Sequence, residues 1–235
     1  MTKPKESGVG LMAFWANIDP DYVLRYQQWH NCEHIPERVS IPGFREGRRY
    51  RAVSDAPHFL MFYETETTNV LASEAYMAAL NSPTNWTREA LTHFHNAVRS
   101  IYSRIGLAGA CGPFAAPYVT TLRFDLPDGG EAQYASRWVE ALTAAKGVER
   151  VRLYRADAAV GNIVTSERKI YGGGPGKQAY LALIEQALPP SEEQDVIALA
   201  DSALSGPFAR ANEERGTYWL EVAHKAVNSS AEEIA

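Results

Sequence analysis

Basic clusters and long apolar runs are both missing from this 235-residue sequence, and each absence excludes a class of partner. Lys and Arg number 23 against 28 Asp and Glu, which gives a net charge of -5, so neither nucleic acid nor an anionic membrane surface is an expected partner. Without a run of about 20 apolar residues, no membrane-spanning helix is predicted. The first eight residues are polar and lack the apolar segment of a signal peptide.

Cysteine is scarce as well. The two cysteines, Cys32 and Cys111, are far apart in the sequence and form no CxxC pair. They make no disulfide framework, and such a cysteine content is typical of a reducing compartment, so we expect a cytoplasmic protein. Apolar residues make up 46% of the chain, which is enough for a sizeable core.

The spacing of apolar residues predicts alternating strands and helices in the first half of the chain. The predicted strands are residues 8–18, 44–53, 58–66 and part of 101–109, and the predicted helices are residues 19–35, 70–80 and 83–102. Pro36 is expected to end the first helix. The resulting β-α-β-β-α-β order is that of a ferredoxin-like unit.

The second half repeats this order. Residues 42–53 (PGFREGRRYRAV) align with 146–157 (KGVERVRLYRAD) at an offset of 104. Residues 60–64 align with 181–185 at an offset of 121, so the second copy carries 17 additional residues between these two strands. A third match follows in the same order, and together they indicate a duplicated unit.

The predicted fold is therefore α+β, with two tandem ferredoxin-like repeats at residues 1–110 and 111–235. Each sheet has helices on one face and must bury the other face. The two sheets are expected to pack against each other and to close a barrel of about eight strands within one chain.

Residues 29–50 contain the string W-x-x-x-E-H-x-P-E-R-x-x-x-P-G-F-x-x-x-R-R-Y, which resembles the EthD-like family of the dimeric α/β-barrel superfamily. The matching residues are Trp29, Glu33, His34, Pro36, Glu37, Arg38, Pro42, Gly43, Phe44, Arg48, Arg49 and Tyr50. The resemblance implies a small, mostly apolar or aromatic ligand in a cleft between sheet and helices. Superfamily members include cofactor-free monooxygenases, lactone isomerases, decarboxylases of polycyclic aromatic acids and haem proteins, so the fold alone does not select a chemistry.

His34 is the first candidate for a catalytic residue. The predicted helix places it near the helix C-terminus, where the helix dipole favours the protonated imidazole. An imidazole with a pKa near neutrality is the usual general acid or base. The alternative is a histidine bonded to a carbonyl of the core. Glu33 is adjacent in sequence but points about 100° away on a helix, so a direct pair with His34 is not expected.

His30 and His34 form the H-x-x-E-H spacing of a zinc site, with His93 or His95 as a third ligand. This alternative is disfavoured because the motif needs a helix that continues beyond Pro36. The resemblance offers haem as a second alternative, with His30 or His34 as the axial ligand. The preferred prediction is a site without a cofactor.

Arg48 and Tyr50 fall on one face of a predicted strand and are candidates to hold a substrate carboxylate or phenolate, since a buried guanidinium needs an acid or an anionic ligand. The alternative is a structural ion pair with Glu37, Glu46 or Glu64. The structural pair is favoured, because Arg152 and Tyr154 repeat the same spacing in the second copy.

Aromatic stripes on the predicted helices either line a flat apolar pocket or belong to the core. These side chains are Tyr22, Tyr26, Trp29, Trp86, His93 and Phe94. The GGGPGK segment at 172–177 lacks the Ser or Thr and the following helix of a phosphate-binding loop, so nucleotide binding is rejected. The long connection 158–176 is interpreted as a lid or an oligomer contact, and a homodimer is compatible with the sequence.

When Trp29 is aligned with Trp138, Val139 and Thr143 stand in place of the two histidines, so the site is expected in the first half. We expect a cofactor-independent enzyme that acts on a small hydrophobic or aromatic acid or ketone, by His34 acid–base catalysis, in a decarboxylase, isomerase or other lyase reaction. The alternatives are a haem-binding or haem-processing protein, a cofactor-free monooxygenase, and a binding protein whose pocket is filled by its own side chains.

Overall fold

Eight strands and two groups of helices make up the computed structural model, which describes residues 10–53, 56–190, 195–204 and 209–226. The strands are β1 (Gly10–Ile18), β2 (Phe44–Ala52), β3 (Phe59–Thr65), β4 (Phe94–Gly109), β5 (Tyr118–Asp125), β6 (Val148–Ala156), β7 (Tyr180–Gln186) and β8 (Ala211–Lys225). The prediction about the first eight residues lies outside the described residues.

The helices of the first half are α1 (Val23–Trp29), η1 (His30–His34), α2 (Ile35–Val39), η2 (Thr68–Ala72), α3 (Glu74–Asn81) and α4 (Asn85–Leu91). Those of the second half are α5 (Glu131–Gln133), η3 (Tyr134–Trp138), α6 (Val139–Thr143), α7 (Ala158–Gly161), α8 (Ser166–Tyr171) and α9 (Val196–Ala203). None of the helices in the described ranges is long and apolar enough to cross a lipid bilayer.

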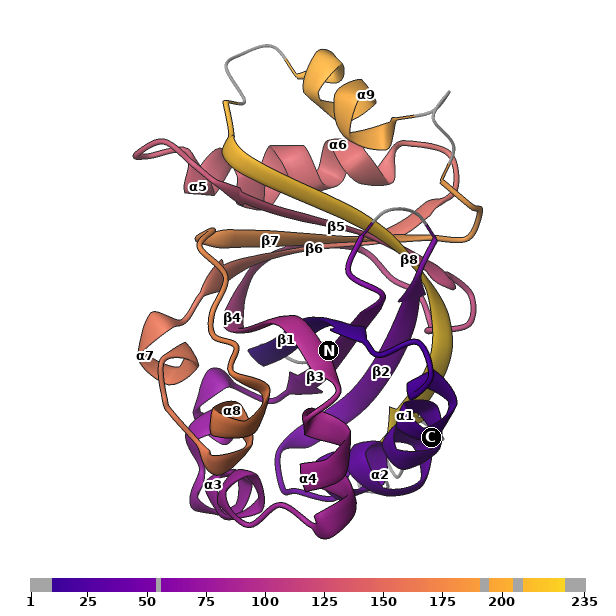
Figure 1. Ribbon diagram of the computed structural model, residues 1–235. Helices are drawn as coiled ribbons and strands as arrows, with labels where there is room; N and C mark the ends of the chain where they lie inside the picture. The colour runs from indigo at the N-terminus through magenta and orange to yellow at the C-terminus, as the bar shows by residue number, and fades with distance from the viewer. Residues whose placement is uncertain (1–9, 54–55, 191–194, 205–208, 227–235) are drawn as a thin grey trace, which may run out of the picture.

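The strands close into one antiparallel barrel in the order β1-β3-β2-β8-β5-β7-β6-β4. Within each half the order is fourth, first, third, second, as in a ferredoxin-like unit, so the predicted tandem fold is confirmed. The seams are β2–β8 and β4–β6, where the second strand of one half pairs with the last strand of the other. In Figure 1 the two sheets face each other, with helices on their outer sides.

The prediction of a helix over 83–102 is wrong beyond α4. Residues 94–109 form β4, which pairs with β1 and then with β6. Asn96 has a φ of +51° at an irregularity in the β1–β4 register, and this shifts the alternation of side chains by one residue. Phe94, Ala97 and Ile101 therefore share one face of a strand at a spacing that imitates a helix.

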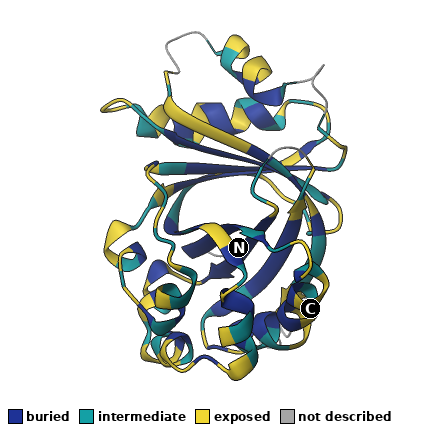
Figure 2. Ribbon diagram, in the orientation of Figure 1, coloured by how far each residue is buried: buried dark blue, intermediate teal, exposed yellow. Residues whose placement is uncertain are grey.

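Each strand alternates between the barrel interior and a helix-covered outer face. Leu11, Ala13 and Trp15 of β1 join the buried interior cluster, whereas Met12 and Phe14 join the cluster under the helices of the first half. A third cluster lies under the helices of the second half. Figure 2 shows most of the strands buried, apart from the exposed first part of β8, and the outer faces of the helices exposed.

Buried ion pairs join the two halves inside the barrel. Arg48 of β2 donates to Glu185 of β7 at 2.9 Å, and Arg152 of β6 donates to Glu64 of β3. Since Arg48 aligns with Arg152, and Glu64 with Glu185, the two contacts are equivalent positions of the duplicated unit. The structural ion pair predicted for Arg48 is thus confirmed, with Glu46 and with the opposite half as its partners.

The 17-residue insertion between β6 and β7 carries α7 and α8 and lies along β4. The Arg99 amide donates to the Gly174 carbonyl at 2.8 Å, and the Gly176 amide donates to Ser100 Oγ at 2.9 Å. A Cβ atom on Gly173 would lie 2.2 Å from the carbonyl oxygen of Ala97. The run of glycines therefore permits a close approach of its backbone to β4.

Replacement of Glu185 by Gln tests the charge network. Burial by itself would raise the pKa of Glu185, but Arg152, Arg150 and Arg48 lower it to about 2. Its stabilising effect is therefore present above the unfolded-state pKa of about 4.5 and is lost as the pH falls towards 2. Glu185→Gln should lower the unfolding free energy at pH 7 by about 3–5 kcal/mol, measured by urea denaturation. The exposed Glu149→Gln should change it by less than about 0.5 kcal/mol; equal effects would contradict the assignment.

Candidate active site beneath the inserted helix

A π-helical turn carries the two candidate histidines. α1 runs directly into η1, where the Ile35 amide donates to the His30 carbonyl five residues back, and α2 continues to Val39. The prediction that Pro36 ends the helix is wrong. Pro36 follows the π turn directly, at a point where the regular ladder of α-helical hydrogen bonds is already interrupted, so its missing amide hydrogen does not stop the helix. His34 consequently lies in the middle of a continuous helical segment.

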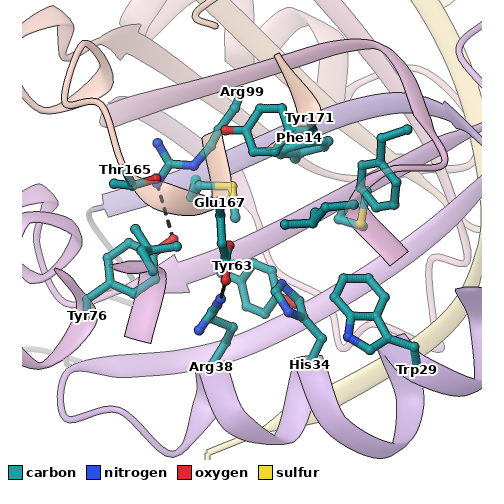
Figure 3. Close-up of a pocket in the computed structure, with 15 residues that line it drawn as sticks. Phe14, Trp29, His34, Arg38, Tyr63, Tyr76, Arg99, Thr165, Glu167 and Tyr171 are labelled. Carbon is teal, nitrogen blue, oxygen red and sulfur yellow. Dashed lines mark hydrogen bonds and ion pairs between the residues drawn. The ribbon is translucent and has the colours of Figure 1, made fainter. Parts of the chain in front are cut away.

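A small cavity lies between the outer face of the first sheet and the helices that cover it (Figure 3). Its volume is about 30 Å³, enough for ordered water. Its apolar wall includes Met12, Phe14, Trp29, Leu80, Leu91 and Phe94. Its polar groups include His34, Arg38, Tyr63, Tyr76, Arg99 and Glu167.

His34 is buried, and its Nδ1 has no hydrogen-bond partner within the part of the chain that the structure describes. Its ring centre lies 4.4 Å from that of Trp29. Burial, and then the positive charge of Arg38, hold the pKa of His34 well below 6.5. The prediction that the helix end favours the protonated ring is therefore wrong, because desolvation dominates in the middle of the helix. The site presents a neutral imidazole that has not been satisfied by a core carbonyl.

His30 lies one layer behind the cavity and orients Tyr63. Arg49 Nη1 lies 3.3 Å from His30 Nδ1, and the Tyr63 hydroxyl lies 3.3 Å from His30 Nε2. A guanidinium only donates, so Nδ1 must accept, and the ring proton on Nε2 points to the tyrosine oxygen. Burial raises the pKa of Tyr63 well above 10, which keeps the phenol protonated. The Tyr63 hydroxyl hydrogen remains to be donated to a ligand.

The insertion from the second half covers the cavity. The Ser166 amide at the start of α8 donates to Asn81 Oδ1 of α3 at 3.0 Å. Glu167 of α8 forms an ion pair with Arg38 of α2, drawn as a dashed line in Figure 3. The Tyr171 ring packs edge-on against Phe14, with ring centres 5.0 Å apart. Of the two interpretations of 158–176, these contacts favour the lid.

The predicted site residues divide into three groups. His34, Trp29 and Phe94 line the cavity. Arg48 and Tyr50 bond to each other inside the barrel, on the opposite face of the sheet, so they cannot contact a ligand in this cavity. Because side chains alternate along β2, Arg48 and Tyr50 share the interior face, and neither side chain lies on the helix-covered face.

The remaining predicted residues lie around the cavity without lining it. Tyr26 is buried behind it, where its hydroxyl contacts the Met61 sulfur at 3.1 Å. Tyr22 stacks on His93 with ring centres 3.7 Å apart, near the outer end of α1. Trp86 lies under the Arg25 guanidinium at 5.2 Å. A role for these aromatic side chains in substrate binding remains a prediction.

Sequence reasoning missed the cavity's polar groups. Tyr63 follows Met61 by two residues on β3, so strand alternation would have placed it on the helix-covered face. Arg38 belongs to the string at 29–50 but received no role. Arg99 was assigned to a helix, and Glu167 has no local signal beyond its position in the insertion.

The zinc and haem alternatives do not fit these residues. Glu33 accepts hydrogen bonds from Thr84 and Thr87 at 2.6 and 3.1 Å, which turns it away from His34. No group of three or more His, Cys, Asp or Glu side chains within the described ranges is arranged to hold a metal. Both ring nitrogens of His30 are occupied, and a tetrapyrrole beside His34 would have to replace the buried wall of the cavity.

Comparison with solved structures establishes the fold. An anthrone oxidase-like protein has a TM-score of 0.58 at 9% identity over 94% of both chains. A candidate monooxygenase from Fusobacterium nucleatum has a TM-score of 0.59 at 9% identity over 93% of this chain and 95% of the other. A chlorite dismutase variant from Candidatus Nitrospira defluvii has a TM-score of 0.51 at 13% identity over 91% and 92%. Neither a protein-family model nor a curated protein sequence matches the chain. At these identities the similarity shows a shared dimeric α/β-barrel fold, and it does not indicate which activity the protein has.

The buried histidines predict a specific pH dependence of stability. Burial lowers the pKa of His30 and His34, so below pH 6.5 the unfolded chain binds protons that the folded chain does not. The unfolding free energy should therefore fall with decreasing pH by about 1.4 kcal/mol per pH unit for each histidine. Urea denaturation between pH 6 and 5 should give a shallower slope for His34→Gln. The exposed His224→Gln serves as the control, and a His34→Gln slope equal to that of the wild type would contradict the assignment.

Proposed function

We propose that this protein is a cofactor-independent enzyme that transfers a proton on a small, mostly apolar aromatic molecule, with His34 as the general acid and base. The observation that carries the proposal is a buried imidazole, lining an apolar cavity, whose Nδ1 has no hydrogen-bond partner among the described residues. Such an unsatisfied polar group has an energetic cost in a core, and a ligand that bonds to it would remove that cost.

The surroundings support a base that acts on a weakly acidic C–H or O–H group. The lowered pKa keeps His34 neutral at pH 7, so the ring is available to accept a proton. As the proton leaves, negative charge develops on a neighbouring substrate oxygen. The Tyr63 hydroxyl, oriented by His30, is available to donate to that oxygen in a site from which apolar side chains exclude water.

The same imidazole can serve three reactions. Removal of a proton from the substrate and its return to another atom gives an isomerisation. In a decarboxylation the transfer runs the other way, because the carbon that loses carbon dioxide receives a proton, and the electron pair of the broken C–C bond forms the new C–H bond. Reaction of the anion with molecular oxygen gives an oxygenation, in which one oxygen atom enters the substrate and the other leaves as water. One structural neighbour is described as oxidase-like and another as a candidate monooxygenase. We also propose that the protein is a member of the EthD-like family, on the basis of the sequence string at 29–50.

Ligand entry requires movement of α8. The cavity of about 30 Å³ is smaller than an aromatic ring, so an aromatic ligand fits only if side chains that fill the site move. Glu167 and Tyr171 both belong to α8, whereas the other walls are the sheet and the main helices. Displacement of this one short helix would enlarge the cavity without disrupting the barrel.

Hydrogen exchange tests the proton transfer whatever reaction follows it. Aromatic ketones with an acidic C–H beside the carbonyl, both with and without a carboxylate on the ring, are incubated with the protein in deuterium oxide, and deuterium uptake is followed by NMR. The wild type should accelerate uptake, and His34→Gln should lower the enzymatic rate by about 100-fold or more, because general acid–base catalysis contributes about 10²–10⁴.

His224→Gln, an exposed histidine on β8, should leave the exchange rate unchanged. Oxygen consumption and carbon dioxide release, recorded in parallel, separate oxygenation from decarboxylation. Full exchange activity in a folded His34→Gln variant would exclude the proposed role.

A further inference from the structure

Arg99 is the exception among the buried arginines. Seven arginines are buried in the described part of the chain, and they are Arg38, Arg48, Arg49, Arg99, Arg123, Arg150 and Arg152. Six of them contact a carboxylate within 4.0 Å. Arg99 has no carboxylate within 4.0 Å among the described residues; the Tyr76 hydroxyl accepts from its Nη2 at 3.2 Å, and the charge of Glu167 acts on it from a longer distance. A buried guanidinium without an acidic partner is costly unless a ligand supplies the missing charge.

The charges lining the cavity leave an excess of one positive charge. Arg38 and Arg99 are cationic, and Glu167 is the single carboxylate in the lining. Glu37 contacts Arg38 at 3.1 Å from outside, but its side chain is 35% exposed, so water screens its charge. Figure 3 shows Glu167 between the two guanidinium-bearing side chains, paired with Arg38.

We infer that the cavity takes a monoanionic aromatic ligand, whose carboxylate is bound by Arg99 and Arg38, and that Glu167 occupies the carboxylate position when this ligand is absent. The inference rests on the proposed function for the location of the ligand. It selects an aromatic carboxylic acid over a neutral ketone. When Glu167 is displaced, the two guanidinium groups remain to hold the ligand carboxylate.

Glu167 is suited to being displaced. Burial raises its pKa even though Arg38 is its partner, so the ion pair does not recover the full cost of removing the carboxylate from water. α8 is six residues long and its C-terminal end passes into the left-handed Gly172. A ligand carboxylate that replaces Glu167 would therefore release α8 and enlarge the cavity in one step.

The test compares 2-naphthoate with its neutral analogue 2-naphthamide, by isothermal titration calorimetry on the full chain at pH 7.5. The wild type should bind 2-naphthoate at least tenfold more tightly than 2-naphthamide. Glu167→Gln should strengthen 2-naphthoate binding about tenfold, because the competing carboxylate is gone. Arg99→Met should remove the preference, because it weakens 2-naphthoate binding more than 2-naphthamide binding.

Arg25→Met, which removes an exposed arginine on α1, is the matched control and should keep the preference. Arg99→Lys, which retains the charge, should preserve part of it if Arg99→Met fails to fold. Equal affinity of the wild type for the two compounds, or an unchanged affinity in Glu167→Gln, would overturn the inference. A carboxylate preference without His34-dependent hydrogen exchange would refute the proposed function alone, and the converse result would refute this inference alone.

Discussion

Closure of the barrel is the constraint on which the rest of this structure depends. Each half alone would expose the second and fourth strands of its sheet and one apolar face. The β2–β8 and β4–β6 seams pair those edges, and each sheet covers the other's inner face. Arg48–Glu185 and Arg152–Glu64 join the halves inside the barrel at equivalent positions of the repeat. The cavity that His34 lines lies on the outer, helix-covered face of the first sheet.

The two copies differ on their outer, helix-covered faces. In the first half, η1 presents His34 to a cavity, whereas the second half has Thr143 at the aligned position. Trp29 and Trp138 keep their scaffold role, since each donates from its indole to the later helix of its half, at Thr87 and Asp201. The second copy instead contributes its insertion, which lies across the cavity of the first. The first half therefore forms most of the cavity wall, and the insertion of the second half covers the cavity.

Desolvation controls the protonation of the cavity. The same burial lowers the pKa of His34 and raises those of Tyr63 and Glu167, so it favours the neutral form of each group. Burial does not neutralise the guanidinium groups, because arginine remains protonated in proteins. Among the buried arginines of the described ranges, Arg99 is therefore the one that keeps its charge without a carboxylate within 4.0 Å.

The sequence by itself determined the duplicated ferredoxin-like fold, because the repeat and the strand alternation are local patterns that survive in any context. It also identified His34, Trp29 and Phe94 as cavity residues. It misplaced Arg48 and Tyr50, since one strand serves two faces and a local pattern does not say which face holds the ligand.

Only the tertiary structure decided the polar half of the site. Arg38, Arg99 and Glu167 come from α2, β4 and the insertion, and Arg38 and Glu167 are 129 residues apart. Packing brings them together, and it also converts an expected helix into β4, because hydrogen bonds to β1 and β6 outweigh an apolar spacing that a bulge made look helical. Charges that meet in low dielectric acquire their energies only when the chain has folded.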